Sequence, residues 1–266
     1  MGTMTGRERL LAVFRGKAPD RIPWAPLVDG YFLASLDGEI NAVEALRMIG
    51  ADILERHVPT YRSIGNKNLT KTQLATAKRE KSNGAIITVE TIGDCQVETH
   101  SEGGKICQEI STPIGVLTGR WVFTATSPYI PFAVERRIKE PKDLRVYRHF
   151  VRQNRFEPCY DVFSREDEYV GDDGLATTSV PCTPFQILLE NELGLEQFYY
   201  FLQDYPDEIE ETLAVLHDQN KEIYKIAAES PAEVVIDHEN TSTTLMSPAL
   251  YERYCLKEIN EYADIL

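Results

Sequence analysis

The stretch between residues 233 and 254 constrains the fold of this chain more than any other. Val234, Val235 and Ile236 form an apolar run without alternation, which is typical of a parallel strand covered on both faces. A polar segment follows, and then Ser247-Pro248, a helix start with Ser as N-cap and Pro at the first helical position. Strand, polar loop and helix in this order predict an α/β fold.

Four polar residues stand where this strand ends: Asp237, His238, Glu239 and Asn240. In α/β sheets and barrels, ligands bind at the carboxyl ends of the strands, so we predict a functional site here. The plainer alternative is that Asp237 and Glu239 pair with nearby cations while His238 fills a polar gap.

A second strand is predicted between residues 51 and 59, after a helix that ends at Gly50. It also carries charged residues at its carboxyl end, namely Glu55, Arg56 and His57. These are interpreted either as ligand-binding groups or as an ordinary solvated strand end. Further strands are predicted near residues 22–28 and 175–181, which gives about half of the eight strands of a closed βα barrel.

Between residues 84 and 123 the pattern changes to a period of two. Apolar and polar residues alternate in four runs, with Gly-containing turns between them, at residues 86–92, 95–100, 106–110 and 114–123. This predicts an antiparallel meander, which a barrel would carry as an insertion. Residues 128–143, which include prolines, are predicted to form a connection.

The composition excludes some partners and compartments. With 266 residues, 42% of them hydrophobic, the chain can bury a substantial core. A net charge of −14 argues against a nucleic-acid binder or an anionic-membrane binder, because both need clustered Lys and Arg. The first residues lack the apolar core of a signal peptide, and no apolar run reaches the length of a membrane span. Cytoplasm is the expected location.

Motifs for common chemistries are missing from the sequence. It contains no P-loop, GxGxxG, GxSxG or HExxH, so phosphoryl transfer, nicotinamide binding and serine hydrolysis gain no support. Its five cysteines form no CxxC or HxC pair, and neither a disulfide framework nor a zinc knuckle is indicated.

Several segments taken together resemble the uroporphyrinogen decarboxylase superfamily, and two of them its methyltransferase-like branch. The matching segments, in order, are Thr5–Pro23, Thr112–Leu117 with Ile138–Leu144 for that branch, Pro184–Gly194 and Asp237–Pro248. The resemblance implies a (β/α)8 TIM-barrel fold in one domain over residues 1–266, with the last barrel strands expected beyond Leu266.

The resemblance also implies a choice between two chemistries. Decarboxylases of the superfamily act on a porphyrinogen without a cofactor, through Arg, Asp and Tyr. Here the segment Trp24–Tyr31 has no arginine to grip the carboxylates. The family's tyrosine falls on Glu190 and its serine at about His238.

The methyltransferase-like branch fits the sequence better. It implies a cobamide-linked methyltransferase or demethylase of a small methylated compound, with zinc, and with a cobamide on a partner corrinoid protein. The zinc ligands would lie beyond Leu266, so the metal ligands are unknown. We predict His238 and Glu239 as catalytic residues. The predicted substrate-binding residues are Glu55, His57, Glu190, Asp237 and Asn240.

Two alternatives remain open from the sequence. One is a porphyrinogen decarboxylase, which product formation from uroporphyrinogen would reveal. The other is an inactive fragment or a binding subunit whose barrel a partner or a second copy in a homodimer completes, since an open barrel exposes strand edges. An HxC motif encoded past Leu266 would favour the methyltransferase, whereas a stop codon there would favour the binding subunit.

Overall fold

The parallel strands carry the predicted site. The computed structural model describes residues 2–28, 30–36, 40–56, 61–63, 86–125 and 127–266. The strands that carry the predicted site are β1 (Ile53–Glu55), β9 (Gly174–Ala176), β10 (Thr178–Val180) and β11 (Val235–Asp237), which pair in parallel. β1 pairs with β9, and β10 pairs with β11. Strands predicted near residues 52–58, 175–181 and 233–237 are therefore confirmed.

The strand predicted near residues 22–28 is wrong. This segment lies outside every described strand, and its link to the β1 region is one backbone hydrogen bond of 2.8 Å from Asp52 N to Trp24 O. Prolines at positions 23 and 26 lack the N–H donors that a ladder needs. The α/β class is confirmed, whereas the described strands form four separate sheets and no closed barrel among them. The barrel stays a prediction.

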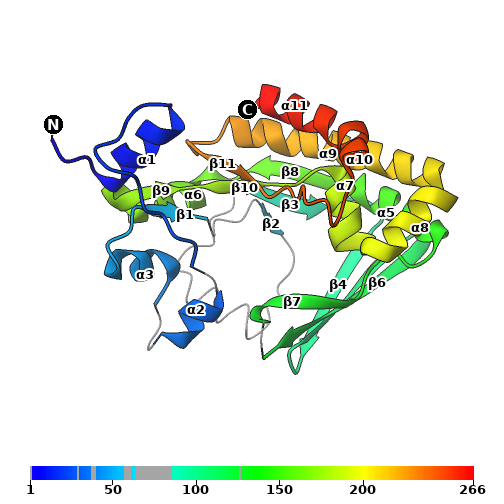
Figure 1. Ribbon diagram of the computed structural model, residues 1–266. Coiled ribbons are helices and arrows are strands. Elements are labelled where there is room, and N and C mark those ends of the chain that lie inside the picture. The colour runs from blue at the N-terminus through cyan, green and yellow to red at the C-terminus, as the bar shows by residue number, and fades with distance from the viewer. Residues whose placement is uncertain (1, 29, 37–39, 57–60, 64–85, 126) are drawn as a thin grey trace.

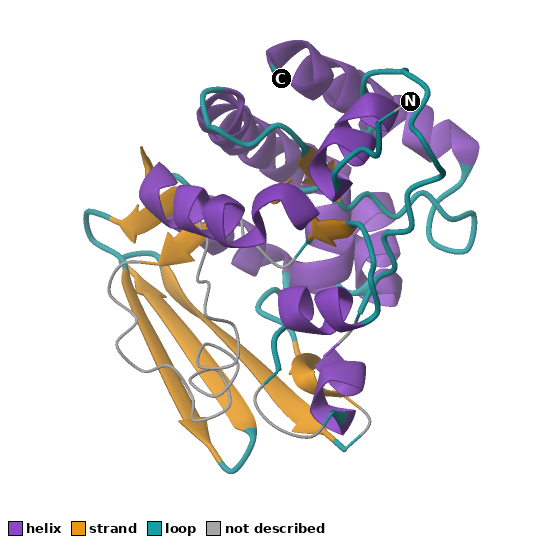
Figure 2. Ribbon diagram, turned by 90° about the vertical axis from the view of Figure 1, so that its left-hand side faces the viewer, coloured by secondary structure: helices purple, strands orange, loops and turns teal. Residues whose placement is uncertain are grey.

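The antiparallel meander is confirmed, with different bounds. It comprises β4 (Gln96–Glu102), β5 (Lys105–Thr112), β6 (Gly115–Thr124) and β7 (Ser127–Glu135), in that order. Figures 1 and 2 show these long strands extending away from the helices. β7 falls in the segment predicted as a connection. Its prolines are tolerated because β7 pairs with β6 alone and forms an edge of the sheet.

The first run expected in the meander belongs to another sheet. That sheet contains β2 (Tyr61–Ser63), β3 (Ile87–Thr91) and β8 (Asn154–Pro158). β3 is parallel to β2 and antiparallel to β8. Alternation predicted a strand correctly at β3, but alternation alone does not identify the pairing partner.

Helices cover the parallel strands, and the longest, α9, runs across them (Figure 1). Ser247 Oγ accepts from Leu250 N, as the predicted N-cap should, and Thr5 forms a capping box with Glu8. The segment Pro184–Gly194 forms a short α-helical turn that continues as a π-helix and stops at Gly194. The helices are α1 (Gly6–Phe14), α2 (Gly30–Ser35), α3 (Ala42–Met48), α5 (Pro141–Val151), α6 (Tyr160–Val170), α7 (Pro184–Gln186), α8 (Leu195–Asp204), α9 (Pro206–Ala228), α10 (Pro248–Tyr254) and α11 (Leu256–Ile265), with a 3₁₀ turn at Gly171–Asp173 and the π-helix at Ile187–Leu193.

Two hydrophobic clusters make up the core, and α9 contributes to both. One joins the base of the meander to α5, α8 and the π-helix, with Leu117, Leu144 and Phe198 at its centre. The other packs around β1, β3, β9 and β10 and contains Ile53 and Tyr224. The carboxyl ends of β10 and β11 lie where these clusters meet, since residues of α9 line both.

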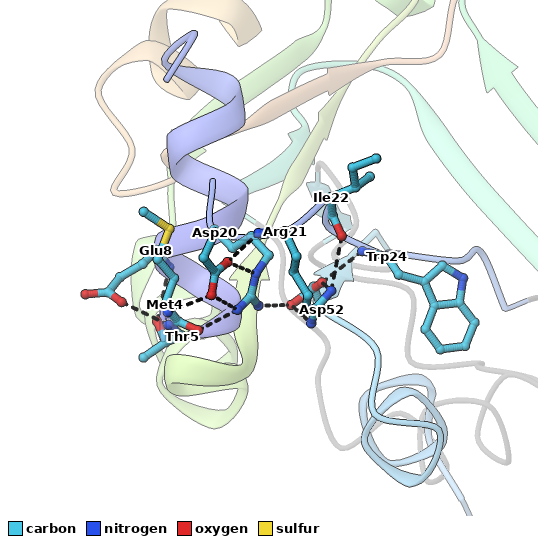
Figure 3. A network of polar contacts seen from close by, with 9 residues as sticks. Met4, Thr5, Glu8, Asp20, Arg21, Ile22, Trp24 and Asp52 are labelled. Atoms are coloured by element: carbon cyan, nitrogen blue, oxygen red, sulfur yellow. Dashed lines mark hydrogen bonds and ion pairs between the residues drawn. The ribbon is translucent and has the colours of Figure 1, made fainter. Parts of the chain in front are cut away.

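A network of buried charges fixes the first helix to the start of β1 (Figure 3). Arg9, whose side chain is 5% exposed, donates to both Asp20 and Asp52. Asp52, 2% exposed, also accepts from Arg21 at 2.7 Å and from Trp24 N at 2.8 Å. Burial opposes the ionisation of Asp52, but the Trp24 amide and the two guanidinium groups outweigh it and lower its pKa. In the N-terminal network, then, every buried carboxylate has a cation.

Candidate functional site

The predicted site lies at the carboxyl end of β11. The register places Asp237 beside Val180, so β10 and β11 end together. β9 and β10 are separated only by Thr177, whose N–H and Oγ1 both donate to Glu55 O at 2.9 and 2.8 Å. Thr177 therefore links the carboxyl end of β1 to the interrupted strand formed by β9 and β10, and β10 in turn pairs with β11.

The last residue of β11, Asp237, and the three residues that follow it contact different partners. Asp237 faces Tyr224 of α9, whose hydroxyl donates to Pro181 O at 3.0 Å, while the exposed His238 reaches Ser179 of β10, with Nε2 and Oγ 3.1 Å apart. Successive strand residues face opposite sides of a sheet, which explains this separation. The two predicted catalytic residues, His238 and Glu239, are therefore not in contact with one another.

Glu239 is held by the start of α7. Its carboxylate accepts from Thr183 N at 2.8 Å and from Thr183 Oγ1 at 2.6 Å. Next along the chain, the carbonyl of Asn240 accepts from Gln186 Nε2 at 2.7 Å. Both contacts tie the loop after β11 to the helix after β10. They place Glu239 over Cys255, a buried residue at the junction of α10 and α11.

The carboxyl groups around this loop favour their protonated forms. Partial desolvation and then the negative charge of Glu239 raise the pKa of Asp237 to about 7, although Tyr224 opposes the shift. Desolvation raises the pKa of Glu239 despite the Thr183 hydrogen bonds. Desolvation and the charges of Glu239 and Glu261 raise the pKa of Glu258, on α11, to about 8. Each group thus retains a proton at a pH where a free carboxyl group has lost it.

No Lys or Arg among the described residues forms an ion pair with Asp237 or Glu239. We call Asp237, Glu239 and Glu258 the strand-end cluster. A basic side chain near the cluster is His217 of α9, with Nδ1 3.8 Å from Glu258 Oε1. The alternative that Asp237 and Glu239 merely pair with neighbouring cations is therefore wrong for the described residues.

Two cysteines border the strand-end cluster. Burial, together with the negative charge of Glu239, raises the pKa of Cys182 to about 12. Burial is also the largest cause of the rise of the Cys255 pKa to about 12. Both side chains are protonated thiols at neutral pH. They do not act there as nucleophiles, which must be thiolates.

Buried acceptor atoms without a hydrogen-bond partner also gather near this loop. Among the described residues they include Gln186 Oε1 and Asn220 Oδ1, on side chains with no exposed surface. Gln186 contacts Asn240, and Asn220 Nδ2 donates to Cys182 O at 2.9 Å. An unpaired buried polar atom costs about 1–3 kcal/mol, and such costs are tolerated where a ligand is bound.

Of the other predicted site residues, Glu190 lies close to the loop. It sits on the π-helix, and its charge raises the pKa values of Glu239 and Cys182. Glu55 ends β1 with its side chain buried, and its role stays a prediction. His57 lies outside the described residues.

Sequence reasoning missed Thr183, Tyr224 and Glu258. The Ser/Thr preference before a helix starting with proline was the available signal for Thr183. Tyr224 and Glu258 occupy ordinary helix positions, one on an apolar face and one among many surface acids. Nothing local in the sequence distinguishes them.

The zinc implied by the resemblance stays a prediction, since its ligands were expected beyond Leu266. Among the described residues, only Asp94, Cys95 and His149 bring three metal-binding atoms within 4.8 Å of one another. These residues belong to the β3–β4 turn and α5, not to the strand-end cluster. We therefore derive no step through zinc at this loop.

Comparison with known proteins leaves the family open. No family model and no curated protein sequence matches the chain. The likeness to the uroporphyrinogen decarboxylase superfamily therefore stays a prediction. Within the described part of the chain, no helix combines the length and the apolar character needed to cross a bilayer.

Proposed function

We propose that this protein is a demethylating methyltransferase of the uroporphyrinogen decarboxylase superfamily that acts on a small methylated compound. The observation that carries the proposal is a carboxyl group, Asp237, with a pKa of about 7 at the carboxyl end of a parallel strand. Proton transfer is most efficient when the pKa of the catalytic group lies near the working pH.

Demethylation gives such a group a defined task. When the bond between a methyl carbon and an oxygen or nitrogen atom breaks, the methyl group passes to a nucleophilic acceptor. The heteroatom keeps the bonding electrons and needs a proton. Protonated Asp237 supplies this proton, and Glu239 keeps the Asp237 pKa high through its charge. The resemblance implies a cobamide on a corrinoid protein as the acceptor, and the described residues supply the proton, not the acceptor.

His238 and Ser179 provide a polar contact on the other face of the strand pair. Their side chains are linked at 3.1 Å and reach the surface. In the proposed site they bind a polar group of the substrate other than the heteroatom that Asp237 protonates. Among the described residues, no Lys or Arg pairs with Asp237 or Glu239, which disfavours a porphyrinogen with several carboxylates, since such a substrate needs arginine clamps.

The test uses the full chain with free cob(I)alamin as the methyl acceptor. A panel of methanol, methylamines, methyl thioethers and methoxyarenes serves as donors, and the absorbance change on cobalt methylation reports turnover. With the active donor, Asp237→Asn and His238→Ala should each lower kcat at least roughly tenfold. Glu252→Gln, at an exposed position on α10, is the matched control.

The pH profile separates a proton donor from a structural residue. Because Asp237 must be protonated, kcat should fall as the pH rises above about 7. This limb should disappear in Asp237→Asn. The proposal is wrong if no donor in the panel is demethylated, or if Asp237→Asn leaves both kcat and its pH profile unchanged. If the protein decarboxylates uroporphyrinogen, the alternative function, a porphyrinogen decarboxylase, replaces the proposed methyltransferase.

A further inference from the structure

The turn between β3 and β4 meets the last turn of α5 at a second group of reactive side chains. Asp94 and Cys95 lie in the turn, and His149 lies on α5. The backbone fixes the two segments together, because Ile92 N donates to Gln153 O at 2.8 Å just beyond α5. Gly93 adopts the left-handed conformation (φ 81°) against the Gln153 side chain, where a side chain of its own would collide.

The three side chains converge on one point. His149 Nε2 lies 3.0 Å from Asp94 Oδ1, and Cys95 Sγ lies 3.8 Å from the same oxygen. All three atoms fall within 4.8 Å of one another. Bond lengths to zinc of about 2.0–2.3 Å in a tetrahedral site place ligand atoms about 3.3–3.6 Å apart. Small side-chain adjustments therefore suffice to surround an ion.

Burial and the helix dipole both suit a cation here. The Cys95 side chain is buried, whereas Asp94 and His149 are 55% and 28% exposed, so an ion can enter from the solvent. His149 stands in the last turn of α5, where the helix dipole favours positive charge. Among the described residues, the thiol forms one weak hydrogen bond, to Asp94. The ligand set of one thiolate, one imidazole and one carboxylate matches metals of intermediate softness.

We propose that Asp94, Cys95 and His149 form a binding site for Zn²⁺ or a divalent transition ion of similar softness. Binding releases one proton, from Cys95, because the ligand is the thiolate. The ion then meets two negative ligands and one neutral imidazole, so the site as a whole is neutral. Three protein ligands leave the fourth tetrahedral position to water.

The site would couple the meander to the helical body. Cys95 directly precedes β4, the outer strand of the meander, and α5 packs against β5 and β6. The competing explanation is an ion pair between protonated His149 and Asp94, which would hold the same segments together without metal. The ion pair between His149 and Asp94 forms without the Cys95 thiol, so replacing Cys95 distinguishes the two explanations.

The experiment titrates the metal-free full-length protein with Co²⁺, which reports thiolate ligation through an intense near-ultraviolet charge-transfer band. We expect one Co²⁺ per chain, with the band displaced by Zn²⁺. Cys95→Ser should abolish the band, and His149→Gln should weaken affinity by more than the roughly 10- to 100-fold that the loss of an outer-shell contact costs. The matched controls are Cys107→Ser and His100→Gln, both exposed positions in the meander. They should bind as the parent does.

Two results would overturn the proposal. One is the absence of a charge-transfer band in the parent protein, which leaves the ion pair as the explanation. The other is a band that persists in Cys95→Ser or disappears in Cys107→Ser. Circular dichroism of each variant confirms folding. If Cys95→Ser fails to fold, the Co²⁺ affinity of His149→Gln provides the test, because His149 is partly exposed.

Discussion

Desolvation opposes the ionisation of carboxyl groups in both the N-terminal network and the strand-end cluster, yet the pKa values move in opposite directions. Asp52 is buried but meets Arg9 and Arg21, and its pKa falls. Asp237 and Glu258 meet other carboxylates, and their pKa values rise to about 7 and about 8. The decisive variable is the neighbouring charge, since desolvation acts in the same direction in both regions.

The difference separates a structural use of acids from a chemical one. In the N-terminal network, ionised carboxylates hold α1 against the start of β1, and the protons are gone at neutral pH. In the strand-end cluster, protons remain on groups that a substrate can reach. Stability is thus assigned to the start of β1 and reactivity to the carboxyl end of β11, as in barrels whose active sites lie at the carboxyl ends of the strands.

The largest expected effect comes from the same substitution in both regions. Asp52→Asn leaves the buried Arg9 with one carboxylate fewer and should lower the free energy of unfolding by about 3–5 kcal/mol. Asp237→Asn removes a group whose ionisation is already disfavoured and should leave stability unchanged or higher. Urea unfolding at neutral pH measures both. Equal losses in the two variants would contradict the comparison.

The second prediction concerns pH. Between the ordinary pKa of 4.5 and about 8, folded Glu258 holds a proton that the unfolded chain releases. The stabilisation that protonated Glu258 contributes is therefore fully present below pH 4.5 and is lost as the pH rises through about 8. The loss is about 1.4 kcal/mol per unit of pKa shift. Glu258→Gln should match the parent at about pH 5 and exceed its stability at about pH 8.

The N-terminal network supplies the control for that experiment. Asp52 has a lowered pKa in the folded protein. Its contribution to the free energy of unfolding is therefore present above the ordinary pKa of 3.8 and is lost as the pH falls through the pKa of the folded state. Glu258→Gln should keep this acid loss, and Asp52→Asn should diminish it. If the stability profiles of Glu258→Gln and the parent are parallel from about pH 5 to about pH 8, the pKa of Glu258 is not raised in the folded protein.

The smallest expected effect tests how far burial matters within the N-terminal network. Arg21 pairs with Asp52, but 49% of its side chain is exposed. Arg21→Gln should therefore lower the free energy of unfolding by only about 0.5–1 kcal/mol, because solvent screens an exposed ion pair. Urea unfolding of Arg21→Gln and Asp52→Asn side by side gives the ratio of the two losses in the free energy of unfolding. A loss as large as that of Asp52→Asn would mean that Arg21, not Arg9, is the main partner.

Local sequence patterns predicted local structure well and pairing poorly. The run Val234-Val235-Ile236 and the pair Ser247-Pro248 carry their own signals, and both elements form close to where they were expected. β3 alternates as the meander strands do, yet it pairs with β8. Pro128 and Pro131 concealed β7, because an edge strand accepts prolines that a central strand rejects.

The location of the site was predictable, and its composition was not. A strand end followed by Asp237-His238-Glu239 is visible in sequence, but the side chains that set its chemistry come from α7, α9 and α11. The group formed by Asp94, Cys95 and His149 shows the same limit. His149 is too distant in sequence to complete a recognisable metal-binding spacing with Cys95.

The pairing of β1 with β9 has a consequence for how the chain acquires its structure. Ile53 is matched with Gly174, and the whole meander lies between them in sequence. Closing so long a loop is entropically expensive, whereas each meander strand pairs with its immediate neighbour in sequence. During synthesis the meander is complete before β9 leaves the ribosome. The parallel strands that carry the site are therefore the last elements whose partners become available.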